Sequence, residues 1–202
     1  PLPKDGTAEL VAGLLKIARR SDLPAPLRLD SMASAPGGLA VVDPELFDFL
    51  RANLGVDTPV ATRSAAASVL ARAKLATAQL ESLTESLKDA GPLELGRLLE
   101  AFEQSADETV GRKLVASLKE SSALTALRAD SIQRSLAKCG PAVQEQAQSL
   151  YAAIHVDVAK QKERLEDLLD STKDGDIRRG QAVFMSAKAI CSIPDRRGVR
   201  IC

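Results

Sequence analysis

Apolar residues recur along this chain at intervals of three and four positions, the spacing of one face of an α-helix. The pattern is clear at Leu10, Leu14 and Ile17 near the start and at Leu95, Leu98, Leu99 and Phe102 in the middle. Proline, glycine and short polar residues separate these segments. We therefore expect helices near residues 7–20, 27–35, 44–54, 58–73, 77–90, 93–104, 107–120, 129–138, 141–154, 157–171 and 175–189.

Three helix starts carry capping residues. We expect the side chains of Thr7, Asp43 and Thr77 to accept hydrogen bonds from the first backbone amides, with Pro44 as the first helical residue after Asp43. Short turns marked by proline or glycine then fold neighbouring helices back on each other as antiparallel pairs.

Alanine and leucine dominate the composition, while aromatic and β-branched residues are few, so the chain is predicted to be all-α. Helix pairs that start near residues 7, 44, 77 and 107 are spaced 37, 33 and 30 residues apart. This spacing favours a HEAT/armadillo-like helical-hairpin solenoid. The segment TPVATRSAAASVLARA fits the second helix of such a repeat, with Arg63 at the turn. Sequence identity between the repeats is weak, and an irregular helical bundle stays an alternative.

Charge and hydropathy exclude several partners. The chain has 27 basic and 27 acidic side chains, and with so few aromatic residues it offers no surface typical of nucleic-acid binding. No apolar run is long enough for a transmembrane segment. The N-terminus does not read as a signal peptide. Because the sequence starts at Pro1 rather than at a methionine, we expect it to be a piece of a longer protein.

Candidate catalytic and metal-binding residues are few. His155, the single histidine, is expected at a joint between two helices, where a structural or exposed role is favoured over a ligand role. Cys139, at a helix end, is expected to be a buried or half-buried thiol. No phosphate loop, nucleophile elbow or zinc-protease motif occurs. We therefore predict no catalytic residue and no metal ligand.

The C-terminal segment GDIRRGQAVFMSAKAICSIPDRRGVRIC carries the most specific signal. It predicts an amphipathic helix that leads to Cys191, then a basic tail that ends at Cys202. The separation of these two cysteines matches no zinc site, and a disulfide between them has no support in the sequence.

This segment resembles the start of a class I cytochrome c domain, in which such a helix precedes a Cys-x-x-Cys-His haem-attachment motif. The matching residues are Gly175, Asp176, Arg179, Gly180, Val183, Phe184 and Cys191. Together with the preceding helices, the pattern is similar to the planctomycete-type haem-binding, membrane-bound dehydrogenase family. In that family, a sugar-dehydrogenase-like β-propeller is followed by HEAT-like helices and a c-type haem domain.

The resemblance implies three regions: a helical-repeat domain at 1–172, the start of a cytochrome c-like haem domain at 173–192, and an aberrant, disordered tail at 193–202. Only Cys191 carries over as a cofactor-binding position, that of the first thioether cysteine. After Ser192 the chain continues Ile-Pro-Asp, so the second cysteine and the axial histidine are missing. Haem c belongs to the parent family, and we expect no cofactor on this chain. One hypothesis is that residues from about 193 are translated out of frame.

Two functions follow as alternatives. In the first, the chain is the spacer and incomplete haem domain of a c-type haem-binding, electron-transfer dehydrogenase, with no activity of its own. It would contact the adjoining domains of a longer parent chain, and its family implies a periplasmic location. In the second, it is a stand-alone HEAT-like scaffold for a protein partner. The first alternative also implies that Val183 and Phe184 are poorly covered.

Overall fold

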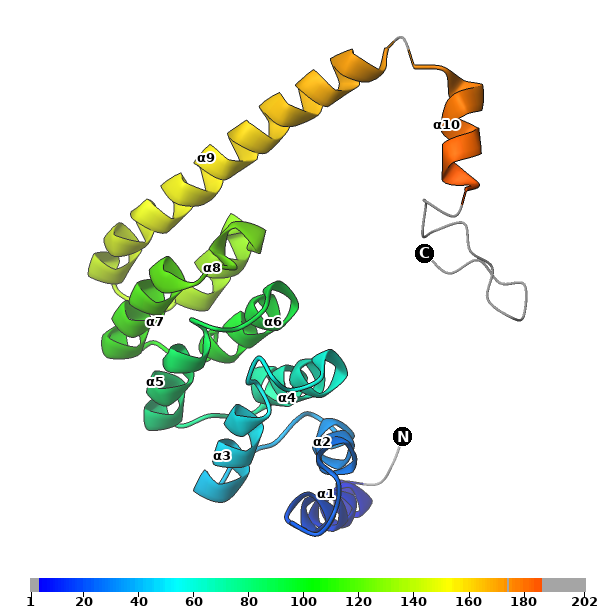
Figure 1. Cartoon of the computed structure of the whole chain (residues 1–202). Coiled ribbons are helices and arrows are strands. Elements are labelled where there is room, and N and C mark those ends of the chain that lie inside the picture. Colours follow the sequence, from blue (N-terminus) through cyan, green and yellow to red (C-terminus); the bar gives the residue numbers. More distant parts are fainter. Residues whose placement is uncertain (1–3, 174, 187–202) are drawn as a thin grey trace. The chain divides into compact units, whose positions relative to one another are not determined.

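A computed structural model describes residues 4–173 and 175–186, without side-chain detail for residues 4–7 and 155–159. In this part of the chain every regular element is a helix and no strand occurs, which confirms the all-α class. The helices are α1 (Lys4–Ala18), α2 (Ala25–Ala33), α3 (Pro44–Ala52), α4 (Val60–Arg72), α5 (Thr77–Ser86), α6 (Pro92–Phe102), α7 (Glu108–Glu120), the short 3₁₀ helix η1 (Leu124–Ala126), α8 (Ala129–Leu136), α9 (Pro141–Thr172) and α10 (Ile177–Phe184) (Figure 1).

The chain divides into two units, Pro1–Val156 and Asp157–Cys202, and the boundary falls within α9. None of the helices in the described ranges is long and apolar enough to cross a membrane.

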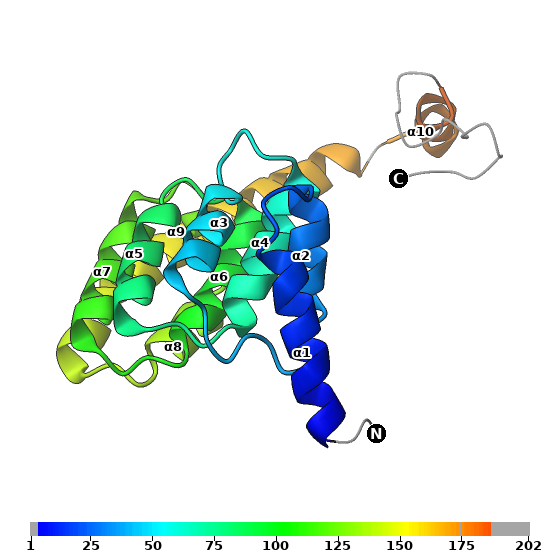
Figure 2. The same ribbon diagram turned by 90° about the horizontal axis from the view of Figure 1, so that it is seen from below.

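The helices of the first unit form two rows. Helices α2, α4, α6 and α8 pack one after another in one row, and α3, α5 and α7 follow each other in the second (Figures 1 and 2). Helix α1 packs on α2 at one end. At the other end, α9 begins beside α7, where Val143 faces Gly111. From α2 to α8, each helix therefore packs on the helix two places along the chain, and α3 also contacts α4 across the rows.

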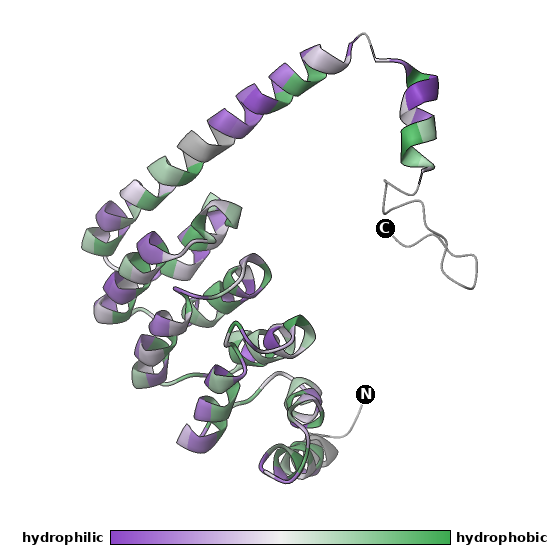
Figure 3. Ribbon diagram, viewed as in Figure 1, coloured by the Kyte–Doolittle hydropathy of each residue, from purple (hydrophilic) through white to green (hydrophobic). Residues whose placement is uncertain are grey.

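One continuous apolar cluster lies between the rows, and Figure 3 shows hydrophobic positions facing inward along them. It is built mainly from leucines at helical spacing, since few aromatic residues are available. Full burial of one such side chain stabilises the fold by about 1.5–3 kcal/mol. The largest completely buried members are Leu29, Met32, Leu39, Leu46, Leu50, Leu70, Leu83, Leu87, Leu95, Leu98, Leu99 and Phe102.

The three predicted caps have different outcomes. Asp43 caps α3 as predicted: its Oδ1 accepts from the Leu46 amide at 2.9 Å, and Pro44 is the first helical residue. The prediction for Thr7 is wrong, because α1 begins at Lys4 and Thr7 lies inside it. The prediction for Thr77 is also wrong. Thr77 is the first residue of α5, and the Gln79 side chain accepts from the Ala76 amide at 2.9 Å instead.

Helix α9 differs most from the sequence prediction. Two helices were expected on either side of residue 156, but α9 runs unbroken from Pro141 to Thr172. The physical reason is that no proline or glycine lies between Pro141 and Gly175, while alanine, lysine, glutamate and leucine all favour helix. The predicted inter-helix joint at His155 does not exist.

Candidate functional site

The residues that resemble the cytochrome c motif lie on and just before α10. The side chain of Asp176 caps this helix and accepts from the amides of Arg178 and Arg179 at 2.9 Å and 3.1 Å. The segment is therefore helical, as expected, although α10 ends at Phe184 rather than near residue 189.

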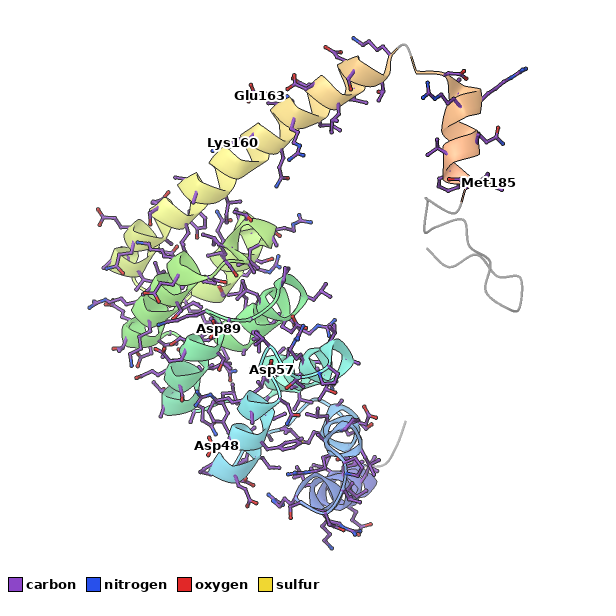
Figure 4. The ribbon with its side chains drawn as sticks, in the orientation of Figure 1. Asp48, Asp57, Asp89, Lys160, Glu163 and Met185 are labelled. Carbon is purple, nitrogen blue, oxygen red and sulfur yellow. The ribbon has the colours of Figure 1, made fainter. Side chains whose placement is uncertain are left out.

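Three apolar side chains of α10 are exposed. Ile177, Val183 and Phe184 are 86%, 55% and 51% exposed. Gly180 has no atom within 4 Å of the position that a Cβ would take, so the surface beside it is open. In Figure 4, Met185 marks the end of this helix. An eight-residue helix is too short to be stable alone in water, so α10 needs a packing partner for this face.

The predicted haem position, Cys191, lies outside the described residues, as does Cys202. The sequence shows which residues occupy the haem-attachment positions. Covalent haem c needs a second cysteine three positions after the first and an axial histidine next to it. Pro194 and Asp195 occupy these positions, and neither side chain supplies a thioether or an imidazole. The residues present do not fit haem c.

His155 and Cys139 are not brought together. His155 lies within α9, in the stretch without side-chain detail. Cys139 is half-buried in the turn before α9, as predicted, and its Sγ faces Gly111. Burial, with a smaller effect of Asp107 and Glu108, raises the pKa of this thiol, so it is a poor nucleophile. In the described ranges no three histidine, cysteine or acidic side chains form a group that could hold a metal ion.

Sequence reasoning missed a buried ion pair in the first unit. Arg63 Nε lies 3.5 Å from Glu94 Oε1, and the two side chains are only 19% and 3% exposed. Arg63 also donates to the carbonyls of Val56 and Thr58 at 2.9 Å each, so it lies at the turn as predicted. Nothing in the sequence indicated that Glu94 is buried, because an acidic residue in the first turn of a helix is common and usually exposed.

Two hollows with polar side chains on the surface of the first unit are larger than a third, of about 170 Å³, beside Arg72 and Arg97. One, of about 250 Å³, is lined by Arg51, Leu54, Gly55, Glu85, Ser86 and Asp89. The Arg51 guanidinium is already bonded to Ser82 Oγ at 2.7 Å. The other, of about 410 Å³, lies between α8 and α9 and is lined by Ala129, Gln133, Gln148, Tyr151 and Ala152.

No protein-family model matches this sequence, and no curated protein and no solved structure matches it either.

Proposed function

We propose that this chain is the helical spacer, and the first part of the haem domain, of a c-type haem-binding electron-transfer dehydrogenase. The observation that supports it best is the uncovered apolar face of α10, which coincides with the motif residues Gly180, Val183 and Phe184. A helix that opens a cytochrome c-like domain needs such a face, because the remainder of that domain packs against it.

The two rows of helices supply the spacer in this proposal. Contact between every second helix is the packing expected of a HEAT- or armadillo-like solenoid, in which each repeat supports the next. Two arginines reinforce contacts within the row of α2, α4, α6 and α8. Arg72 donates to the carbonyls of Ala33 and Ala35 at the end of α2, and Arg97 donates to Ser64 on α4. Such a body suits the task of holding neighbouring domains at a fixed separation.

The chain itself has no catalytic role in this proposal. Its described residues hold no group of histidine, cysteine and acidic side chains that could bind a metal ion, and residues 192–195 supply no haem ligands. Oxidation of a substrate and transfer of its electrons belong to other domains of a periplasmic parent, while this chain positions those domains.

Covalent haem binding tests the proposal. The gene is expressed for periplasmic export beside a c-type haem maturation system, once in the present frame and once in each frame shifted after codon 191. We expect no covalent haem on the present product and a haem-staining band on one shifted product. A Cys191→Ala variant of that product should lose one of the two thioethers. Absence of haem from all frames contradicts the proposal.

A second candidate is a stand-alone scaffold for a protein partner. The hollow at the α8–α9 end favours it, because Gln133 and Gln148 place amide donors and acceptors beside the Tyr151 ring. Amides of this kind pair with the backbone of a bound peptide. The scaffold function is favoured if the tail IPDRRGVRIC is confirmed and the products of all three reading frames bind no haem.

A further inference from the structure

Helices α4 and α6 lie side by side in the first unit (Figures 1 and 2). At their start, Arg63 of α4 pairs with Glu94 of α6. At their end, the Gln104 side chain donates to the carbonyl of Ala73 at 3.1 Å. Both pairs join residues 31 positions apart, so the two helices run parallel and in register.

Two arginines on this pair of helices are held by uncharged partners. Arg97 of α6 donates to the hydroxyls of Ser64 and Ser68, one turn apart on α4. Arg72, one turn beyond Ser68, donates to two carbonyls at the end of α2 at 3.2 Å and 3.1 Å. Within the described part of the chain neither guanidinium forms an ion pair, so no carboxylate neutralises either charge by direct contact.

The two arginines line the hollow of about 170 Å³ together with Ser68, Ala71 and Glu100. Two guanidinium groups and one carboxylate leave this hollow with one positive charge in excess. Its volume is below the roughly 300–1,000 Å³ of pockets that enclose small-molecule ligands. It therefore has room for one side chain of a partner rather than for a cofactor.

We propose that this hollow binds the carboxylate of an aspartate or glutamate side chain in an extended segment of a protein partner. Arg97 uses one of its nitrogens and Arg72 two, so each guanidinium keeps N–H donors for a ligand. Guanidinium and carboxylate groups match in shape and charge. This contact does not depend on haem attachment, because it uses only side chains of the first unit.

The charge of the hollow selects a carboxylate over a phosphate. One excess positive charge balances one carboxylate. A phosphorylated side chain carries a charge of about −1.5 to −2, and Glu100 would repel the surplus. The partner therefore presents an acidic residue rather than a phosphorylated one.

Exposed apolar side chains lie toward the start of the same two helices. Leu93, 72% exposed, lies one turn before Arg97, and Val60, 54% exposed, lies one turn before Ser64. At a rise of 1.5 Å per residue, Leu93 lies about 6–10 Å along the helix from Arg97 and Glu100. This distance equals about two or three residues of extended chain. We therefore expect an apolar residue at about this separation from the acidic residue of the partner.

Fluorescence anisotropy of a labelled peptide with the full chain tests the proposal. The peptide Ser-Leu-Ser-Ser-Glu-Ser-Ser-Leu-Ser carries a leucine on each side of the glutamate, so that it fits in either direction. We expect a dissociation constant on the order of 100 µM at low ionic strength, which rises with added salt. The same peptide with glutamine in place of glutamate should bind at least about tenfold more weakly. Equal affinities, or no binding of the glutamate peptide up to about 2 mM, overturn the proposal.

Substitution of both arginines locates the contact. The double variant Arg72→Gln with Arg97→Gln should raise the dissociation constant of the glutamate peptide at least about tenfold. Arg128→Gln, at an arginine whose side chain is 83% exposed just before α8, is the matched control and should leave it unchanged. Far-UV circular dichroism shows whether each variant keeps its helices. Unchanged binding by the folded double variant places the peptide elsewhere and overturns the proposal.

Glu100→Gln gives a test that a loss of folding cannot imitate. Removal of this like charge should make the glutamate peptide bind about threefold to tenfold more tightly. A peptide with phosphoserine in place of glutamate should bind the unmodified chain no more tightly than the glutamate peptide does, and Glu100→Gln should improve its binding most. Tighter binding of the phosphoserine peptide to the unmodified chain overturns the assignment of a carboxylate ligand.

Discussion

Arg63 and Glu94 form a buried ion pair whose loss leaves one charge without a partner inside the protein. Removing one member of such a pair typically costs about 3–5 kcal/mol. We therefore expect Glu94→Gln to lower the free energy of unfolding strongly, because Arg63 would then keep only the carbonyls of the preceding turn. Urea unfolding followed by circular dichroism measures the change.

The matched control is Glu103→Gln. Arg134 Nε and Glu103 Oε1 are also 3.5 Å apart, but these side chains are 59% and 42% exposed. An exposed pair contributes about 0–1 kcal/mol, so this variant should change little. Equal losses for the two variants would mean that burial does not set the importance of the Arg63–Glu94 pair.

Two adjacent glycines between α2 and α3 have similar backbone conformations but different packing. Gly37 and Gly38 have φ values of +76° and +81°, where an L-residue pays about 1–2 kcal/mol. A Cβ on Gly37 would meet nothing within 4 Å, whereas a Cβ on Gly38 would collide with the carbonyl oxygen of Arg72 at the end of α4. Gly38→Ala should therefore lower the melting temperature more than Gly37→Ala. Similar melting temperatures would show that the loop moves freely away from α4.

Asp43 links the stability of α3 to pH. The Leu46 amide, and after it Arg19, hold the pKa of this carboxyl below its usual value. A lowered folded-state pKa adds stability that is present above the unfolded-state pKa of about 3.9 and is lost as pH falls through the folded-state pKa. Asp43→Ala should cost about 1 kcal/mol at neutral pH. The cost should shrink below about pH 4, and thermal unfolding at both pH values measures it. A constant cost would assign the effect to something other than the ionised cap.

At the scale of the element, α9 is one helix with two environments. Leu150 is 1% exposed in the first unit, while Leu168 is 55% exposed in the second. Leu150→Ala should cost about 2–5 kcal/mol, because it leaves a cavity in the core. Leu168→Ala should stay within about 0.5 kcal/mol at low protein concentration. A large loss at Leu168 would mean that this face is already packed within the monomer.

Helix starts were predictable from the sequence where a proline occupies the first turn. Asp43 followed by Pro44 fixed the start of α3, and Pro92 and Pro141 each begin a helix, since proline favours the first turn. The predicted caps at Thr7 and Thr77 were wrong, because a threonine is also tolerated inside a helix. The sequence does not show which backbone amides lack a partner within the helix.

The continuity of α9 could have been predicted, because no proline or glycine lies between Pro141 and Gly175 and the apolar residues keep helical spacing from the buried half into the exposed half. The Arg63–Glu94 pair, by contrast, was not predictable. It joins residues 31 positions apart, and only the packing of α4 on α6 removes both side chains from water. The helix that carries Gly180, Val183 and Phe184 was predictable, since its pattern is local.

At the scale of the whole molecule, the two rows of the first unit are held together by one apolar cluster and by hydrogen bonds between helices. The apolar cluster joins successive helices, and Arg51, Arg72 and Arg97 bond to serines or carbonyls of neighbouring helices. In the second unit, large apolar side chains of both α9 and α10 are exposed.

The most direct test of the electron-transfer account is the DNA sequence from codon 185 through codon 202 and into the DNA beyond it. The account predicts that one reading frame continues Cys191 and Ser192 with one further residue and then Cys-His, followed by codons for the remainder of a haem domain. If IPDRRGVRIC is confirmed and no frame supplies a Cys-His at this position, the assignment to a haem-binding dehydrogenase is contradicted.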